Sequence, residues 1–415
     1  MIPELKAVNA LGVHLEGRRI GAITRSAGER YVFAFAQDYY DDPNRPRLSL
    51  SFKGQSGGLV TAIRPTGVRL PAFFSNLLPE GDLRAYLAEK AGVKEEREFY
   101  LMALLGGDLT GAATVMPMTG AGEDVWAGRE APIPEPAGKR QRLLRFSLAG
   151  VQLKFSAVLE KAGGLTIPAG GAGGSWIVKL PSPRFAAVSE NEYAMLELAR
   201  AVGIEVPRTR LVRPEEIDGL PGDVERVEGL ALAVERFDRA EDGGRIHMED
   251  FAQVFGQFPS EKYESRSYAN IASVLWAETG DAGAYEFVRR LAFSVAIGNG
   301  DMHLKNWSVL YPDGRVPILS PAYDFVSTVP YIPGDELALR FGQSKSLGGI
   351  TLDQIRLFAD KGGLPVKPVW DIVRETMERT REAWKTLAEK DVLPAKMLGA
   401  IERQIERATG VTGAE

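Results

Sequence analysis

The chain has 415 residues, of which 45% are hydrophobic and 25% are charged, and it carries a net charge of −5. One ordinary hydrophobic core cannot hold a globular chain of this length, so we expect two or three packed units, one of them a large catalytic domain. The negative charge argues against direct nucleic-acid binding, the lack of cysteine excludes disulfides and thiolate nucleophiles, and only three histidines argue against a multi-histidine metal site.

The chain is expected to be cytoplasmic and to have no contact with a membrane. Residues 1–21 lack a basic start followed by an apolar run, and no stretch of about 18 apolar residues occurs later. Secretory signal peptides and membrane-spanning helices need those patterns.

An N-terminal, β-rich unit is predicted at residues 1–118. Alternating and apolar runs between residues 5 and 63, separated by Gly, Asn and Pro, are typical of short strands, and the apolar spacing at 71–106 is typical of helices. Residues 119–139 are rich in Gly, Pro and charge and have no apolar period. Such a composition indicates a linker, so we place a domain boundary there.

A second, β-containing unit is predicted at residues 140–237. Its strand-like runs extend from about 142 to 180 and return at 208–213 and 229–234. The glycine-rich stretch 162–175 interrupts them. Because no Lys-Ser or Lys-Thr follows it, this stretch indicates a flexible hairpin tip and not a phosphate loop.

Helices are predicted within and after this unit. Ser189 is a candidate N-cap for a helix that ends at Gly203. Beyond Asp238 the apolar residues recur every three or four positions, as they do on the buried face of a helix. This spacing predicts an all-helical lobe over residues 238–415.

The strongest chemical signal is the pair Asp301 and Asn306 in the segment GDMHLKN at residues 300–306. Phosphoryl transfer needs a carboxylate that accepts the proton of the attacking hydroxyl and an amide oxygen that holds magnesium. The two residues stand five apart, as in the kinase catalytic loop H-R-D-x-x-x-x-N. Alone this pattern is weak, because Asp and Asn are frequent in turns.

Asp324 strengthens that signal. It follows an apolar run and precedes Phe325, as the metal-binding Asp of a D-F-G segment does, although Val326 replaces the glycine. Upstream, Lys179 ends the apolar run Trp176–Lys179, which resembles the V-A-I-K strand whose lysine binds phosphates. An edge-strand lysine that points to solvent is the alternative.

Two interpretations remain open for Glu192 and two for the segment 235–237. Glu192 either pairs with Lys179 or completes a capping box that starts at Ser189. The segment is either a hinge whose backbone binds the adenine edge or a plain surface turn. The functional residues of protein kinases occur in a fixed order along the chain. This sequence has candidates for them in the same order, namely Lys179, Glu192, the segment 235–237, Asp301, Asn306 and Asp324.

Segments along nearly the whole chain resemble the HipA family of bacterial toxin kinases. They are FFSNLLPEGDLR at 73–84, FSLAGVQLK at 146–154, IVKLP at 177–181, NEYAMLELA at 191–199, LAVERFDR at 232–239, VFGQFPSEKYE at 254–264, GDMHLKN at 300–306 and PAYDF at 321–325. The resemblance implies an α+β, bilobal protein-kinase-like fold with an added β-rich N-terminal subdomain and an all-helical C-terminal lobe.

The same resemblance implies an activity and partners. The expected activity is phosphorylation of a protein serine or threonine with ATP and Mg²⁺. The expected substrate class is the aminoacyl-tRNA synthetases, whose modification slows translation and growth. The expected partner is a HipB-type DNA-binding antitoxin, through which alone the chain would contact nucleic acid.

The resemblance also assigns roles by position. The phosphate-covering loop would comprise Ala149, Gly150, Val151, Gln152, Leu153 and Lys154. Lys179 would contact phosphate, and Glu192 would hold Lys179 in place. Adenine would be bound by Glu235, Arg236 and Phe237. Asp301 would accept the proton, and magnesium would be bound by Asn306 and Asp324. The same site would be lined by His303, Lys305 and Tyr323. Ser147 matches the serine that members of this family autophosphorylate, and a phosphate there would repel ATP and expel the loop.

Two other functions compete with this one. Asn299–His303 resembles the H-G-D-x-H-x-x-N loop of aminoglycoside and choline kinases and departs from it only at Asn299, which favours a small-molecule phosphotransferase. The first 118 residues and the VERFD and FSLAG segments fit that function poorly. The second is a catalytically idle corepressor that binds an antitoxin, although every catalytic residue type is present. Gly150 stands alone where standard kinase loops have three glycines, which leaves the mode of phosphate binding open, although the resemblance implies that a single glycine is normal for this family.

Overall fold

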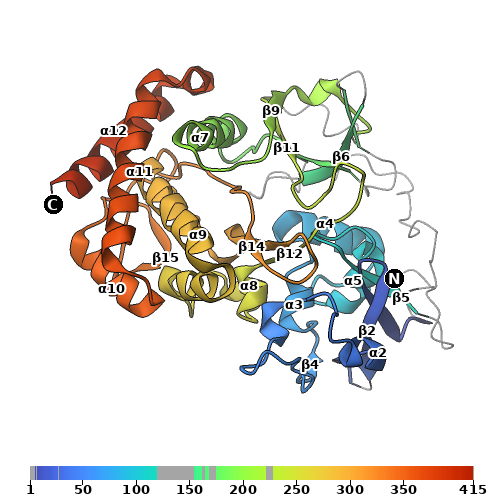
Figure 1. The fold of residues 1–415 in the computed structure, drawn as a ribbon. Helices are drawn as coiled ribbons and strands as arrows, with labels where there is room; N and C mark the ends of the chain where they lie inside the picture. Colours follow the sequence, from blue (N-terminus) through green and yellow to red (C-terminus); the bar gives the residue numbers. More distant parts are fainter. Residues whose placement is uncertain are drawn as a thin grey trace.

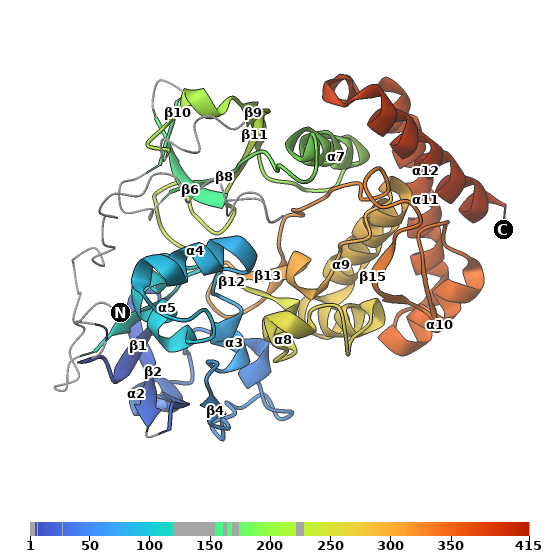
Figure 2. The ribbon, with the colours of Figure 1, turned by 180° about the vertical axis from the view of Figure 1, so that it is seen from behind.

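The computed structural model describes residues 5, 7–26, 28–118, 154–160, 164–167, 174–220 and 228–414. Ser147, the loop residues 149–153 and the expected linker 119–139 lie outside the described residues, as does most of the expected hairpin tip. In Figure 1 an N-terminal unit in blue and cyan lies below a green lobe that carries a sheet, and a yellow-to-red lobe lies beside both. The view from behind, in Figure 2, shows the same arrangement.

The N-terminal unit is a five-stranded antiparallel sheet in the order β4-β3-β2-β1-β5, with helices beside it. Its strands are β1 (Ala10–Leu15), β2 (Arg18–Ser26), β3 (Arg30–Phe35), β4 (Thr66–Gly67) and β5 (Ala113–Pro117). Its helical elements are α2 (Gln37–Asp41), η1 (Leu50–Phe52), α3 (Ala72–Ser75), α4 (Gly81–Ala91) and α5 (Glu98–Leu105). Buried and partly exposed residues alternate along β5, because one face of the strand lies on the core and the other does not.

The middle unit, or N-lobe, carries a six-stranded sheet in the order β10-β7-β6-β8-β11-β9. Its strands are β6 (Lys154–Leu159), β7 (Leu165–Thr166), β8 (Trp176–Lys179), β9 (Thr209–Val212), β10 (Ile217–Asp218) and β11 (Ala231–Glu235). Its helical elements are α7 (Val188–Val202) and η2 (Pro214–Glu216). The central strand β8 pairs antiparallel with β6 on one side and with β11 on the other, so its last residue, Lys179, lies inside the sheet and not at an edge.

The C-terminal lobe is mainly helical but not all-helical, so that part of the expected architecture is wrong. Its helical elements are α8 (Phe251–Val254), η3 (Pro259–Glu261), α9 (Tyr268–Ile297), η4 (Leu304–Asn306), α10 (Leu352–Gly362), α11 (Val366–Thr386), η5 (Glu389–Val392) and α12 (Ala395–Gly413). It also contains the strands β12 (His247–Asp250), β13 (Ser308–Tyr311), β14 (Ile318–Leu319), β15 (Glu336–Phe341) and β16 (Ser344–Ser346). Most of these strands are four residues or shorter, and β12 and β13 are buried along their whole length, so no alternating pattern marks them.

Helix α7 starts differently from the expectation and ends as expected. Its cap is Ala187, at a left-handed φ of 54°, and Ser189 stands inside the first turn, so Ser189 is not the N-cap. Gly203 closes the helix at φ 92°, a conformation that glycine adopts without steric cost.

Three hydrophobic clusters form the core of the described residues. One lies within the N-terminal unit and one within the sheet of the N-lobe. The largest fills the C-terminal lobe and also includes Met195 and Leu198 of α7 and Leu50 of the N-terminal unit. Helix α7 therefore packs on the C-terminal lobe while its neighbours in sequence belong to the N-lobe. Among the helices that the structure describes, none is both long and apolar enough to span a bilayer.

Candidate active site

Lys179 lies at the centre of an ion-pair network between the two lobes. Antiparallel pairing of β6 with β8 sets Lys179 directly opposite Lys154. The Nζ of Lys179 donates to Oε1 of Glu192 on α7 at 2.5 Å and also to Oδ1 of Asp324. The Nζ of Lys154 lies 3.9 Å from Oδ2 of Asp324. The structure thus brings together one lysine pair and two carboxylates that are distant in sequence.

The electrostatics of this network keep Asp324 ionised. Burial alone would raise the pKa of Asp324, but the ammonium groups of Lys154 and Lys179 outweigh it and hold that pKa well below its ordinary value. Burial alone would lower the pKa of Lys179, and the carboxylates of Asp324 and Glu192 instead raise it. Near neutral pH the network therefore presents the charged carboxylate of Asp324 and the charged ammonium of Lys179.

Glu192 points to Lys179 and not back toward the start of α7. The helix begins at Val188, and no side-chain hydrogen bond caps it. The capping box starting at Ser189 is therefore not formed. Of the two interpretations that the sequence left open, the ion pair describes the structure.

The loop after α9 is organised around the backbone of Asp301. The N–H of Asp301 donates to Oδ1 of Asn299 at 3.0 Å. Its carbonyl accepts from the N–H of His303 and from Nδ2 of Asn306, both at 2.8 Å. Because the amide nitrogen of Asn306 is used in this way, its amide oxygen is the atom that could bind a metal ion.

Gly300, which precedes Asp301, has no room for a side chain. A Cβ at this position would lie 2.2 Å from Oδ2 of Asp335. The N–H of Gly300 donates to Oγ1 of Thr328 at 2.9 Å, which holds the loop against the segment that carries Asp335. A glycine is thus required here by close approach.

The side chain of Asp301 contacts Tyr263, a residue to which sequence reasoning gave no role. The hydroxyl of Tyr263 donates to Oδ1 of Asp301 at 2.7 Å. Partial burial raises the pKa of Asp301, while the hydrogen bond from Tyr263 and the charge of Lys262 oppose that rise. In the sequence, Tyr263 is marked only by its place in the motif VFGQFPSEKYE. That motif does not indicate which residues Tyr263 contacts.

His303 is held as a neutral ring. Burial, followed by the nearby charge of Lys262, lowers the pKa of His303 to about 3. Its ring packs edge-on against the ring of Tyr263 with centroids 5.0 Å apart. Its Nδ1 has no hydrogen-bond partner among the described residues. In this arrangement His303 packs the loop and brings no positive charge.

Lys305 forms an ion pair and a hydrogen bond with the N-terminal unit. Its Nζ lies 3.0 Å from Oε1 of Glu80 and 2.9 Å from the carbonyl oxygen of Asn76. The other carboxylate oxygen of Glu80 binds Nζ of Lys262 at 2.9 Å. Burial alone would raise the pKa of Glu80, but Lys305 and Lys262 lower it to about 2. Sequence reasoning missed Glu80, because nothing in the motif FFSNLLPEGDLR indicates where it docks.

The segment 235–237 begins with the last residue of β11 and joins the two lobes. The N–H of Glu235 donates to the carbonyl of Arg208, and the N–H of Arg236 donates to the carbonyl of Ser175. The Glu235 carboxylate is paired with the Arg208 guanidinium. Because the backbone just before β9 and β8 uses both of these N–H groups, Phe237 is the residue of this segment that could meet an adenine edge.

Phe237 packs against Tyr323, which contacts the loop 300–306. Its ring centroid is 5.6 Å from that of Tyr323. The hydroxyl of Tyr323 contacts Oγ of Ser308 at 2.6 Å and the carbonyl of Lys305 at 2.9 Å. Tyr323 therefore links the hinge to the loop that carries the candidate base.

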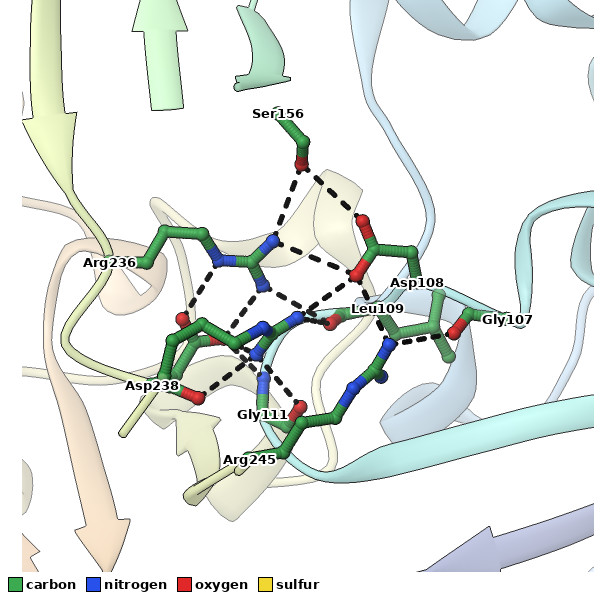
Figure 3. Close-up of polar contacts among 9 residues, drawn as sticks. Gly107, Asp108, Leu109, Gly111, Ser156, Arg236, Asp238 and Arg245 are labelled. Atoms are coloured by element: carbon green, nitrogen blue, oxygen red, sulfur yellow. Dashed lines mark hydrogen bonds and ion pairs between the residues drawn. The ribbon is translucent and has the colours of Figure 1, made fainter. Parts of the chain in front are cut away.

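The side chain of Arg236 is buried in a cluster of charged residues (Figure 3). It donates from Nε and Nη2 to Asp238 at 2.9 and 2.8 Å. Asp108, which belongs to the N-terminal unit, lies 3.0 Å from Arg239, 3.2 Å from Arg245 and 3.7 Å from Arg236. The other partners in the cluster are Gly107, Leu109, Gly111 and Ser156. This cluster ties the hinge to the N-terminal unit.

Asp324 and Asn306 are suited in chemistry to Mg²⁺. Asp324 sits at φ 55°, in the left-handed region that non-glycine residues rarely adopt, so its surroundings hold the backbone there. Magnesium takes hard oxygen ligands, and it often binds through one or two protein groups together with substrate phosphates and water. Within the described ranges, no group of three or more His, Cys, Asp or Glu side chains is arranged to hold a metal ion.

Comparison with known proteins identifies the family of the chain. A family model for the HipA-like C-terminal domain matches residues 146–384, and one for the HipA N-terminal domain matches residues 11–116. A Sinorhizobium fredii protein, Y4dM, named as a candidate kinase, is 51% identical over 400 residues, or 95% of this chain and 96% of its own. The serine/threonine-protein kinase toxin HipA of Shewanella oneidensis is 26% identical over 86% of this chain and 84% of its own.

The fold is also found in a solved structure. The complex of Shewanella oneidensis HipA with HipB and operator DNA contains a chain that matches with a TM-score of 0.74 at 23% identity, over 97% of this chain and 98% of that one. At that identity the likeness establishes the fold, an α+β kinase-like core with an added N-terminal unit. With both HipA family models matched in order along its length, and with a relative that is half identical over nearly all of it, this chain belongs to the HipA family.

Proposed function

We propose that this chain is an ATP- and Mg²⁺-dependent protein serine/threonine kinase that acts as a toxin. The strongest support is the network in which Lys179 contacts both Glu192 and Asp324. Active kinases need this lysine-glutamate pair and a metal-binding aspartate in place at the same time. An idle corepressor would have no need of a buried lysine between two carboxylates.

The chemistry follows from the side chains. Lys179 and Lys154 neutralise phosphate oxygens of ATP, and Phe237 meets the adenine. Asp324 and the amide oxygen of Asn306 would hold Mg²⁺, which when bound would supply positive charge to the phosphates. The acceptor oxygen attacks the γ-phosphorus, its proton passes to Asp301, and ADP leaves. Glu235 and Arg236 contribute backbone to the hinge, since their side chains are paired elsewhere.

The substrate and the partner are proposed from the family. The relative from Shewanella oneidensis is a serine/threonine-protein kinase toxin, and its solved structure holds HipB and operator DNA. We propose an aminoacyl-tRNA synthetase as the phosphorylated protein, with slowed translation as the result. The partner would be a HipB-type antitoxin, and contact with DNA would come only through it.

Ser147 is proposed as a self-inactivating switch. A phosphate there would place about two negative charges beside the loop 149–154, and like charges in a partly dry cleft repel strongly. Phosphorylated protein should then bind ATP more weakly than unmodified protein, and Ser147→Ala should carry no phosphate at this position. Equal ATP affinities of the two separated forms would rule the switch out.

One experiment separates the three functions. The purified chain is incubated with Mg²⁺ and radiolabelled ATP, alone, with a panel of purified bacterial aminoacyl-tRNA synthetases, and with choline or aminoglycosides. A protein kinase should label a synthetase at Ser or Thr, and Asp301→Asn should abolish the label. Transfer only to a small molecule would favour the phosphotransferase, and no turnover with any acceptor would favour the corepressor.

A further inference from the structure

Tyr263 holds one oxygen of the carboxylate that the proposed reaction uses as its base. Its hydroxyl donates to Oδ1 of Asp301 at 2.7 Å, and the residue as a whole is 44% exposed. A carboxylate has two oxygens, so a bond that fixes Oδ1 sets the direction of Oδ2. In the part of the chain that the structure describes, no hydrogen bond to Oδ2 is found, and this oxygen can accept the proton of an acceptor hydroxyl. An unfixed carboxylate would rotate about its last side-chain bond and lose that alignment.

The segment that carries Tyr263 is itself attached to the catalytic loop. The N–H of Leu304 donates to the carbonyl of Lys262 at 3.2 Å, one residue before Tyr263. The ring of Tyr263 packs edge-on against His303 of the loop, with centroids 5.0 Å apart. The hydroxyl is thus aimed at Asp301 by one backbone bond and one ring contact.

Glu80 of the N-terminal unit supports the same segment. Its carboxylate spans two lysines, with Oε2 2.9 Å from Nζ of Lys262 and Oε1 3.0 Å from Nζ of Lys305. Lys262 precedes Tyr263, and Lys305 lies in the catalytic loop. One carboxylate from the N-terminal unit therefore joins the segment that orients the base to the loop that carries it.

We propose that Tyr263 is a positioning residue for Asp301 and that Glu80 acts through Lys262 to hold Tyr263 in place. The N-terminal unit then takes part in phosphoryl transfer by fixing the geometry of the base, without touching ATP. This proposal rests on the proposed kinase function, because it assigns to Asp301 the role of proton acceptor.

The first test is Tyr263→Phe, which removes the hydroxyl and keeps the ring packed on His303. The kcat for transfer should fall about tenfold, because a hydrogen bond to a charged group is lost, while the Kd for Mg-ATP should stay within about twofold. Tyr40→Phe is the matched control, since Tyr40 is 46% exposed in the N-terminal unit, and it should behave as wild type. A kcat for Tyr263→Phe within twofold of wild type would overturn the positioning role.

The second test is Glu80→Gln, alone and combined with Tyr263→Phe. The single variant should lower kcat about threefold, because Glu80 is partly exposed and solvent weakens its ion pairs. The double variant should be no slower than Tyr263→Phe, since both changes interrupt the same connection. If the fold-decreases in kcat of the two single variants multiply in the double variant, the link through Glu80 is overturned. Glu264→Gln, which removes an exposed carboxylate from the same segment, should leave kcat unchanged.

A measurement that needs no activity separates this proposal from the kinase function. Hydrogen–deuterium exchange of the peptide spanning residues 299–306 should be faster in Tyr263→Phe and in Glu80→Gln than in wild type and in the two controls. If wild type transfers no phosphate but exchange rises in both variants, the kinase function fails and the contact network stands. If wild type is active and both exchange and kcat are unchanged in the variants, the positioning role fails alone.

Discussion

Lys179 and Asp324 are in direct contact across the two lobes although 145 residues separate them in sequence. The lysine lies between Asp324 and Glu192, so it stays paired when one carboxylate is removed. The protein can therefore lose the Asp324 carboxylate without leaving an unpaired buried cation, which makes this position suitable for testing.

Asp324→Ala and Asn306→Ala should each weaken Mg²⁺-dependent binding of ATP, because each removes an oxygen that we propose as a ligand of the metal ion at the phosphates. Adenosine should bind almost unchanged, since it has no phosphates. Calorimetry with both ligands checks this. Equal losses for adenosine and Mg-ATP would indicate a damaged fold and would contradict the assigned metal ligands.

Asp301→Asn should bind Mg-ATP as wild type does and should lose phosphoryl transfer. The amide cannot accept the proton of the acceptor hydroxyl, while Lys179 and Asp324 are untouched. Growth inhibition on expression should disappear with the activity. A variant that still labels its target near the wild-type rate would remove Asp301 from the role of base.

Asp108→Asn should lower the free energy of unfolding by about 3 kcal/mol or more, because it leaves three largely buried arginines with one aspartate in the cluster of Figure 3. Urea denaturation followed by fluorescence measures the change. Asp371→Asn is the control, since Asp371 pairs with Lys367 on the surface of α11 and such exposed pairs contribute about 0.5 kcal/mol or less. Similar values for the two variants would show that the cluster does not stabilise the junction.

Glu249→Gln should change how stability depends on pH. Burial raises the pKa of Glu249 from 4.5 to about 7, although Ser49, Tyr311 and the backbone of Leu50 donate hydrogen bonds to it. The folded protein then binds this proton more tightly than the unfolded chain does, so stability from this group falls as the pH rises from about 4.5 to about 7 and is level above.

The comparison needs two pH values. The free energy of unfolding of wild type minus that of Glu249→Gln should be about 2 kcal/mol greater at pH 5 than at pH 8. Other titrating groups cancel in that difference. A difference that is the same at both pH values would mean that Glu249 is ionised in the folded protein.

The candidate catalytic residues could be picked out from the sequence because each one is marked by its immediate neighbours. Lys179 follows an apolar strand, Asp301 and Asn306 keep a fixed spacing in one loop, and Asp324 follows another apolar run. Gly203 as the end of α7 could also be predicted, because a left-handed residue after a helix favours glycine. Local backbone geometry carries all of these signals.

The contacts that surround those residues were decided by the tertiary structure alone. Tyr263 reaches Asp301 across 38 residues, Glu80 reaches Lys262 across 182, and Asp108 reaches Arg239 across 131. An ion pair or a hydrogen bond between distant side chains leaves no period or spacing in the sequence, because it depends only on where the folded backbone carries the two ends. The tertiary structure also decided the role of Glu192. The sequence allowed it to complete a capping box with Ser189, but in the folded protein its side chain pairs with Lys179. The same is true of the short strands of the C-terminal lobe, which form only because partner strands from elsewhere in the chain lie beside them.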